Sequence, residues 1–170
     1  MKAKSLSIAV VVFFSVSIPT SALAQTSIRD TGRRLPNRHR QVRVPRKTEA
    51  ARLIRTVLQA QAAAWNRGDI EGYMDGYDRS PNTEFVSSDN ISRGWQTVLD
   101  RYKRNYNTRD KMGVLTFSDL EITMLSKDAA LVLGRWRLKR ANDEPHGTFT
   151  LLFRKTKSGW RIVHDHSSSA

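Results

Sequence analysis

The chain has 170 residues, with 29 Lys and Arg against 16 Asp and Glu, a formal net charge of +13 and no cysteine. This length is enough for one domain with a packed core. The lack of cysteine excludes a disulfide framework and any thiolate metal site, and it is compatible with a periplasmic protein.

The first 24 residues have the features of a secretory signal peptide. Lys2 and Lys4 precede an apolar run over residues 6–18, and Ala22-Leu23-Ala24 forms an A-x-A-type cleavage site. The run is shorter than the roughly 18 to 20 residues that span a bilayer, which argues against an uncleaved anchor. We therefore expect cleavage after Ala24 and a periplasmic or secreted protein.

Residues 25–47 carry eight basic residues and one acidic residue, with two prolines and no apolar periodicity. Such a segment cannot bury enough apolar surface to order itself, so we predict a disordered basic arm. Its charge suits contact with an anionic membrane surface, and the alternative is a solvated linker. Nucleic acid is not an expected partner, because an exported protein rarely meets it.

The first part of the domain, which we expect over residues 48–170, has helical periodicity. Apolar residues recur every three or four positions from Ala50 to Trp65, and Gly68 suits a helix C-cap. Asp69 can cap a second, short helix. The predicted elements are helices at 49–67 and 70–77, short strands at 83–87 and 90–93, and a third helix at 94–106.

The period changes to that of strands after Lys111. Four long strands are predicted at residues 113–125, 129–140, 144–155 and 160–168. The short connections between them predict antiparallel hairpins, and helices followed by a meander are typical of an α+β fold. Several strands are apolar on both faces, so one face is expected to meet the helices and the other a partner subunit.

Five motifs, in this order, resemble the NTF2-like superfamily, and more narrowly its SnoaL-like and DUF4440-type bacterial members. They lie at residues 64–74, 85–87, 93–95, 134–136 and 159–167. The resemblance covers about residues 50–169. It implies a cone-shaped barrel, in which about three helices pack on a curved antiparallel sheet of four long strands plus a short hairpin. It also implies a ligand cavity and a homodimer formed through the outer sheet face.

The superfamily includes ketosteroid isomerases, polyketide cyclases and dehydratases as well as non-catalytic transport and assembly domains, so the fold does not decide the function. We expect a domain that binds a small, partly apolar molecule. The sequence leaves open whether it is an enzyme; if it is, the expected chemistry is cofactor-free acid–base catalysis of the isomerase, cyclase or dehydratase type. The alternative is a non-catalytic dimeric interaction module whose basic arm contacts an anionic surface. An open cavity with convergent polar groups favours the first, and a cavity plugged by aromatic side chains favours the second.

His164, Asp165 and His166 end the last predicted strand. In a regular strand both imidazoles point to one face and Asp165 to the other, so Asp165 cannot easily orient either histidine. The two histidines could share a pocket wall and transfer protons there, or they could hydrogen-bond the backbone at the sheet end. The catalytic candidates are His164, His166 and Tyr77.

Six aromatic residues at helix or strand spacings are candidates for the pocket wall, although residues of this kind more often belong to the core. They are Trp65, Tyr73, Tyr77, Trp95, Tyr102 and Trp136. Alternation places Arg135 and Arg137 opposite Trp136, where they would favour an anionic ligand if they faced inward and act as surface charges if they faced outward. No carboxylate base of the isomerase type could be aligned, and neither a metal nor a cofactor is expected.

Overall fold

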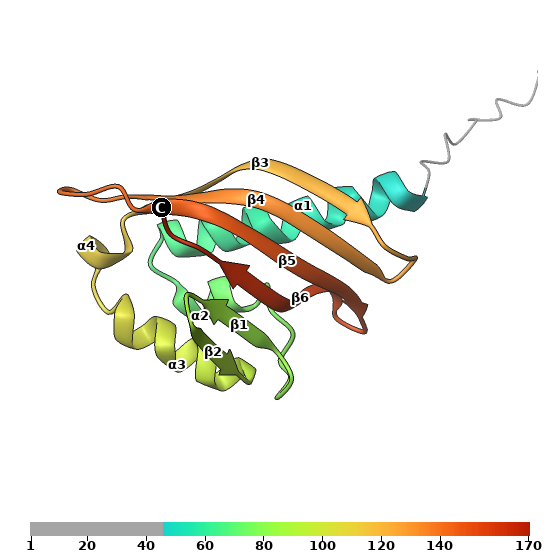
Figure 1. Cartoon of the computed structure of the whole chain (residues 1–170), viewed down its shortest axis with the longest axis horizontal. Helices are drawn as coiled ribbons and strands as arrows, with labels where there is room; N and C mark the ends of the chain where they lie inside the picture. The colour runs from blue at the N-terminus through green and yellow to red at the C-terminus, as the bar shows by residue number, and fades with distance from the viewer. Residues whose placement is uncertain (1–45) are drawn as a thin grey trace, which may run out of the picture. The chain divides into compact units, whose positions relative to one another are not determined.

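The computed structural model describes residues 46–170, so the predicted signal peptide and nearly all of the predicted basic arm lie outside the described residues (Figure 1). Within this part of the chain, no helix is long and apolar enough to cross a membrane. The helices are α1 (Arg46–Asn66), α2 (Ile70–Met74), α3 (Trp95–Asn105) and α4 (Arg109–Met112). The strands are β1 (Glu84–Ser87), β2 (Asn90–Arg93), β3 (Val114–Met124), β4 (Ala129–Lys139), β5 (His146–Thr156) and β6 (Gly159–Ser167).

Helix α1 turns one continuous stripe toward the sheet. Ile54, Leu58, Gln61 and Trp65 recur at steps of three or four residues, and each is at most 2% exposed. The helix begins at Arg46 rather than at the predicted residue 49, so the last two residues of the predicted arm belong to it. In Figure 1 the long strands curve over α1.

The six strands form one curved, open sheet in the order β2-β1-β6-β5-β4-β3. Every neighbouring pair is antiparallel except β1 and β6, which are parallel. This confirms the predicted α+β fold, in which helices pack on a curved sheet. One detail differs from the prediction, because α4 is an additional short helix. The prediction did not say how the small hairpin joins the sheet, and in the structure β1 pairs in parallel with β6.

The two faces of the long strands differ in burial. Val132, Leu151 and Phe153 point inward and are at most 4% exposed, whereas Leu131 and Leu133 on the outer face of β4 are 37% and 46% exposed. Side chains alternate along a strand, so these residues belong to two opposite faces of the sheet. The helices cover the inner face, and the outer face is left uncovered in a single chain.

The C-terminal end of α1 is held against the start of β3. The Asn66 side chain donates to the Leu115 carbonyl (3.0 Å) and accepts from the Leu115 amide (2.7 Å). Trp65 Nε1 donates to the Met112 carbonyl at 3.0 Å, with the ring buried. These bonds give the large Trp65 ring a single position between the helices and the sheet.

Candidate functional site

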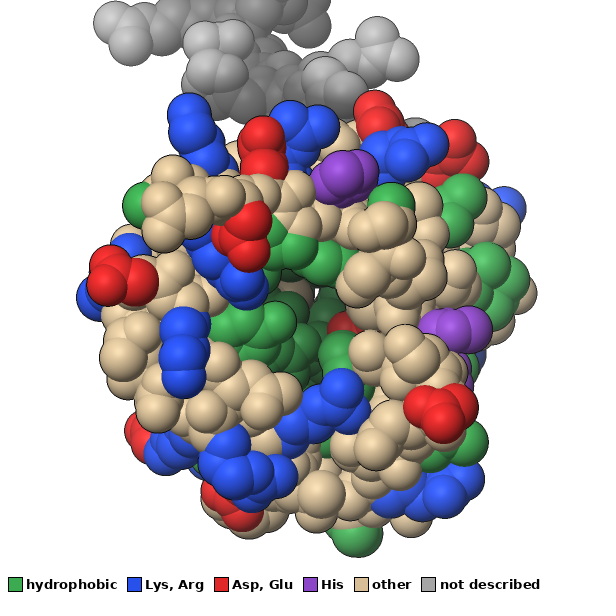
Figure 2. All heavy atoms as spheres, turned by 60° about the vertical axis from the view of Figure 1, so that its left-hand side comes forward, with side chains coloured by type: hydrophobic (Ala, Val, Ile, Leu, Met, Phe, Trp, Pro, Cys, Tyr) green, Lys and Arg blue, Asp and Glu red, His purple; other side chains and the backbone are tan. Residues whose placement is uncertain are grey.

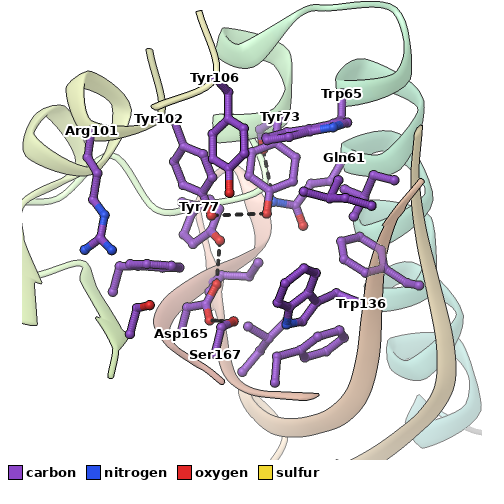
Figure 3. Close-up of a pocket in the computed structure, with 18 of the residues that line it drawn as sticks. Gln61, Trp65, Tyr73, Tyr77, Arg101, Tyr102, Tyr106, Trp136, Asp165 and Ser167 are labelled. Atoms are coloured by element: carbon purple, nitrogen blue, oxygen red, sulfur yellow. Dashed lines mark hydrogen bonds between the residues drawn. The ribbon is translucent and has the colours of Figure 1, made fainter. Parts of the chain in front are cut away.

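A cavity of about 140 Å³ lies between the helices and the inner face of the sheet. Figure 2 shows the molecule hollowed on this side, with hydrophobic side chains inside the hollow and Lys or Arg side chains around its rim. Figure 3 shows rings from α1, α2, α3 and β4 pointing into it. The aromatic residues that carry a polar atom on its wall are Trp65, Tyr73, Tyr77, Tyr102, Tyr106 and Trp136.

Asp165 is a buried carboxylate on this wall, with 4% of its surface exposed. The Tyr77 hydroxyl donates to its Oδ2 at 2.6 Å, and the Ser167 hydroxyl donates to its Oδ1 at 2.7 Å (Figure 3). Burial raises the pKa of the Asp165 carboxyl above its ordinary value of 3.8, and the hydrogen bonds from Tyr77 and Ser167 oppose that rise only in part. A carboxyl in this setting can change its protonation state closer to neutral pH than an exposed one.

The predicted orientation of the His-Asp-His segment needs correction. If β6 were regular, His164 and His166 would share the inward face of Trp160 and Ile162. A bulge at Val163 shifts the register, so that Phe153 pairs with Ile162 while Leu152 pairs with His164. The extra residue reverses the alternation, and Asp165 therefore points inward while both histidines point outward.

The two histidines accordingly do not line the cavity. His164 Nδ1 lies 3.0 Å from Glu84 Oε2. The hydrogen bonds of Glu84 with His164 and with Arg93 lower the pKa of the Glu84 carboxyl. His166 is exposed on the outer face, where it pairs with Thr150. The alternation of Asp165 against its two neighbours is as predicted, but the face that meets the cavity is the opposite one.

The other candidates divide clearly. Tyr77 contacts Asp165, and Trp65, Tyr73, Tyr102 and Trp136 also line the cavity. Trp95 does not; its Nε1 donates to the Met74 carbonyl and the Arg79 guanidinium lies 4.5 Å from its ring centre. Strand alternation is consistent with Trp136 on the inner face of β4. Nothing in the sequence of α3 alone shows that Tyr102 lines the cavity and Trp95 does not.

Other polar atoms of the wall include tyrosine hydroxyls and the Gln61 amide. The Tyr73 and Tyr102 hydroxyls lie 3.5 Å apart, and burial raises the pKa of Tyr73, Tyr77 and Tyr102 well above the ordinary value for tyrosine. They therefore remain neutral and can donate hydrogen bonds. Gln61 is 1% exposed and donates from Nε2 to the Tyr73 carbonyl at 3.0 Å.

Sequence reasoning missed Asp165 as a cavity residue and did not single out Gln61 or Ser167. The periodicity of α1 already placed Gln61 on the buried stripe, and a polar side chain in such a stripe is a usable signal of a site. Asp165 had no comparable signal, because its orientation depends on the bulge.

Arg135 and Arg137 point outward, as surface charges, and pair with Asp119 and Glu144. Within residues 46–170, no three His, Asp or Glu side chains are grouped so that they could hold a metal ion. Among the described residues, the cavity therefore offers a carboxyl group, hydroxyls, side-chain amides, the Arg101 guanidinium and aromatic rings. Such a set can bind a small ring and move a proton to or from it.

Comparisons with known proteins agree with this architecture. The family model described as SnoaL-like domain matches residues 54–170. A solved NTF-2 like protein of unknown function from Shewanella oneidensis MR-1 is 43% identical, with a TM-score of 0.67, over 72% of this chain and 98% of that one. No curated protein matches the chain.

Two more distant solved structures share the fold. A ketosteroid isomerase-like protein from Erwinia carotovora atroseptica is 19% identical, with a TM-score of 0.58, over 71% of this chain and 96% of that one. An NTF2-like superfamily protein from Salmonella enterica is 21% identical, with a TM-score of 0.57, over 72% of this chain and 92% of that one. On the family match and the 43% identical structure, the chain belongs to the SnoaL-like family of NTF2-like proteins.

Proposed function

We propose that the protein binds a small, ring-containing molecule in its cavity and that Asp165 exchanges a proton with it. The observation that carries the proposal is the buried Asp165 carboxyl on an aromatic wall, with the Tyr77 hydroxyl 2.6 Å away. The reaction class is cofactor-free acid–base chemistry, such as isomerisation or dehydration.

The size of the cavity supports a ligand with one ring. An engineered apolar cavity of about 150 Å³ binds benzene, and the cavity here measures about 140 Å³. The wall around it is mostly aromatic, which suits the faces and edges of a flat ligand. Substituents on the ring would extend toward the open side seen in Figure 2.

The chemistry follows from the protonation states on the wall. An ionised Asp165 accepts a proton from a carbon next to a carbonyl group, and it then returns the proton to another carbon or to a leaving hydroxyl. The neutral tyrosine hydroxyls can donate to the ligand oxygen on which negative charge develops. The Tyr77 and Ser167 hydroxyls hold the carboxyl in one orientation throughout.

The open cavity also bears on the alternative, a non-catalytic interaction module. That reading expects aromatic side chains to fill the cone, whereas here they line an open space that contains convergent polar groups. We therefore favour ligand binding.

The proposal can be tested with the isomerisation of 3-cyclohexenone to its conjugated isomer, followed by ultraviolet absorbance. We expect the wild type to accelerate the reaction and Asp165→Asn to lower the rate by about 100-fold or more, because general acid–base catalysis contributes that much. Asp75→Asn is the matched control, since the Asp75 carboxylate is exposed and pairs with Arg79. A wild-type rate equal to that of buffer, or an unchanged rate in Asp165→Asn, would refute the proton-transfer role.

We further propose that two copies associate through the outer face of the sheet, where Leu131 and Leu133 are exposed. Light scattering after size-exclusion chromatography should give about twice the monomer mass, and a monomer mass would remove this proposal.

Export to the periplasm and contact of the basic arm with anionic lipid remain proposals from the sequence. Deleting residues 25–47 should abolish salt-sensitive binding to anionic liposomes.

A further inference from the structure

Arg101 is a cation on the wall of the aromatic cavity. It extends from α3 with its guanidinium carbon 5.0 Å from the centre of the Phe85 ring (Figure 3). Its Nη1 makes two long hydrogen bonds, to Asn90 Oδ1 at 3.3 Å and to Ser92 Oγ at 3.2 Å. Within residues 46–170 it forms no ion pair with a carboxylate, so most of its donors are available to a ligand.

A second arginine adds positive charge to the same side. Arg140 makes one ion pair, to Asp143 at 3.3 Å, and its buried Nε has no hydrogen-bond partner among the described residues. The charges of Arg140 and Arg101 both lower the pKa of Tyr106 against the rise that burial causes, so both guanidinium groups act on this part of the wall. Among the described residues that line the cavity, Asp165 is the one acidic side chain.

We infer that the ligand is an anion: a single aromatic or unsaturated ring with a carboxylate group, which binds the Arg101 guanidinium while the ring lies against the aromatic wall. The inference rests on the proposed function and specifies its substrate class. The planar guanidinium can donate two parallel hydrogen bonds to a carboxylate, a geometry that a neutral amide cannot accept in the same way. Arg101 and Asp165 come from α3 and β6, so the anionic group and the reacting carbon can contact different residues.

Benzoate and benzamide are matched probes, because they have the same ring and similar shape but differ in charge. Trp65 and Trp136 line the cavity, so their fluorescence reports binding to the full chain. We expect benzoate to bind the wild type roughly tenfold more tightly than benzamide, which is the lower end for hydrogen bonds to a charged group because the site is partly open. Arg101→Gln should bring the two affinities together.

Arg104→Gln is the control. Arg104 lies on the same helix and is exposed, and it is not among the residues that line the cavity. It should leave the preference for benzoate unchanged, which separates direct contact from a loss of general positive charge. Arg101→Lys keeps the charge but not the two-pronged geometry, and it should retain part of the preference.

The outcomes distinguish the preference for an anion from the binding of a ring. Equal binding of benzoate and benzamide by the wild type would overturn the anion preference and leave ring binding in place. A preference that survives in folded Arg101→Gln would overturn the assignment to Arg101. Binding of neither probe would overturn both the inference and the ring-binding function on which it rests. If Arg101→Gln does not fold, the salt dependence of binding to the wild type tests the same point. Added NaCl should weaken the binding of benzoate but not that of benzamide, because salt screens the charged contact.

Discussion

Replacing Tyr77 by phenylalanine removes one oxygen from the buried hydrogen bond to Asp165 and keeps the ring in place. The Tyr77 side chain is 1% exposed, and its hydroxyl lies 2.6 Å from Asp165 Oδ2. The substitution leaves this carboxylate oxygen without its donor in a largely apolar wall. The ring still packs against Tyr73, with the ring centres 6.1 Å apart, so little packing is lost.

Hydrogen bonds to charged groups contribute about 1.5–3 kcal/mol to stability, and we expect Tyr77→Phe to lower the free energy of unfolding by that amount near neutral pH. For a domain of this size the melting temperature should fall by roughly 5 to 15 °C. The pKa of Asp165 should rise further, because the bond from Tyr77 is the stronger of the two hydrogen bonds that lower it. The assay is urea unfolding followed by circular dichroism, at neutral pH and again near pH 4.

Tyr106→Phe is the matched control. Tyr106 also lines the cavity, and its hydroxyl makes no hydrogen bond within the described residues, so the loss should stay below about 0.5 kcal/mol. Near pH 4 the effect of Tyr77→Phe should shrink, because a protonated carboxyl gains less from a donor than an ionised one. A loss equal to that of Tyr106→Phe, or one that does not change with pH, would refute the role of this bond.

Three further predictions concern the wall and the outer face. Burial raises the folded-state pKa of Asp165, so its stabilising contribution is fully present below the unfolded value of 3.8 and is lost as pH rises through the folded value. Urea unfolding should therefore show Asp165→Asn gaining stability relative to the wild type as pH increases from about 4, and a constant difference would contradict the assigned burial. Gly76→Ala should cost about 1–3 kcal/mol in the same assay, because its new Cβ would lie 2.4 Å from Cδ of the buried Gln61; wild-type stability would show that Gln61 moves freely. His166→Ala should change the free energy of unfolding by less than about 0.5 kcal/mol and should leave the binding of ring probes unchanged, since His166 is exposed outside the cavity. Weakened binding would show that His166 belongs to the site.

Much of the fold could be predicted because its signals are local. The stripe from Ile54 to Trp65 and the alternation along β4 each depend on the geometry of one helix or one strand. The same rules put Trp65 on the stripe of α1 and Trp136 on the face opposite Arg135 and Arg137, and in the structure both rings line the cavity. The parallel pairing of β1 with β6 could not be predicted in this way, because it joins segments that are distant in the chain.

The sequence alone determined most of the helices and strands, apart from α4, and which side chains share one face of each regular element, because hydrophobic periodicity depends only on neighbours in the chain. The tertiary structure decided which side chain of the His-Asp-His segment enters the cavity. A single extra residue at Val163 reverses the alternation of β6, and that bulge depends on how β6 pairs with β5. The buried carboxyl of Asp165, and with it the candidate chemistry of the site, follows from this pairing.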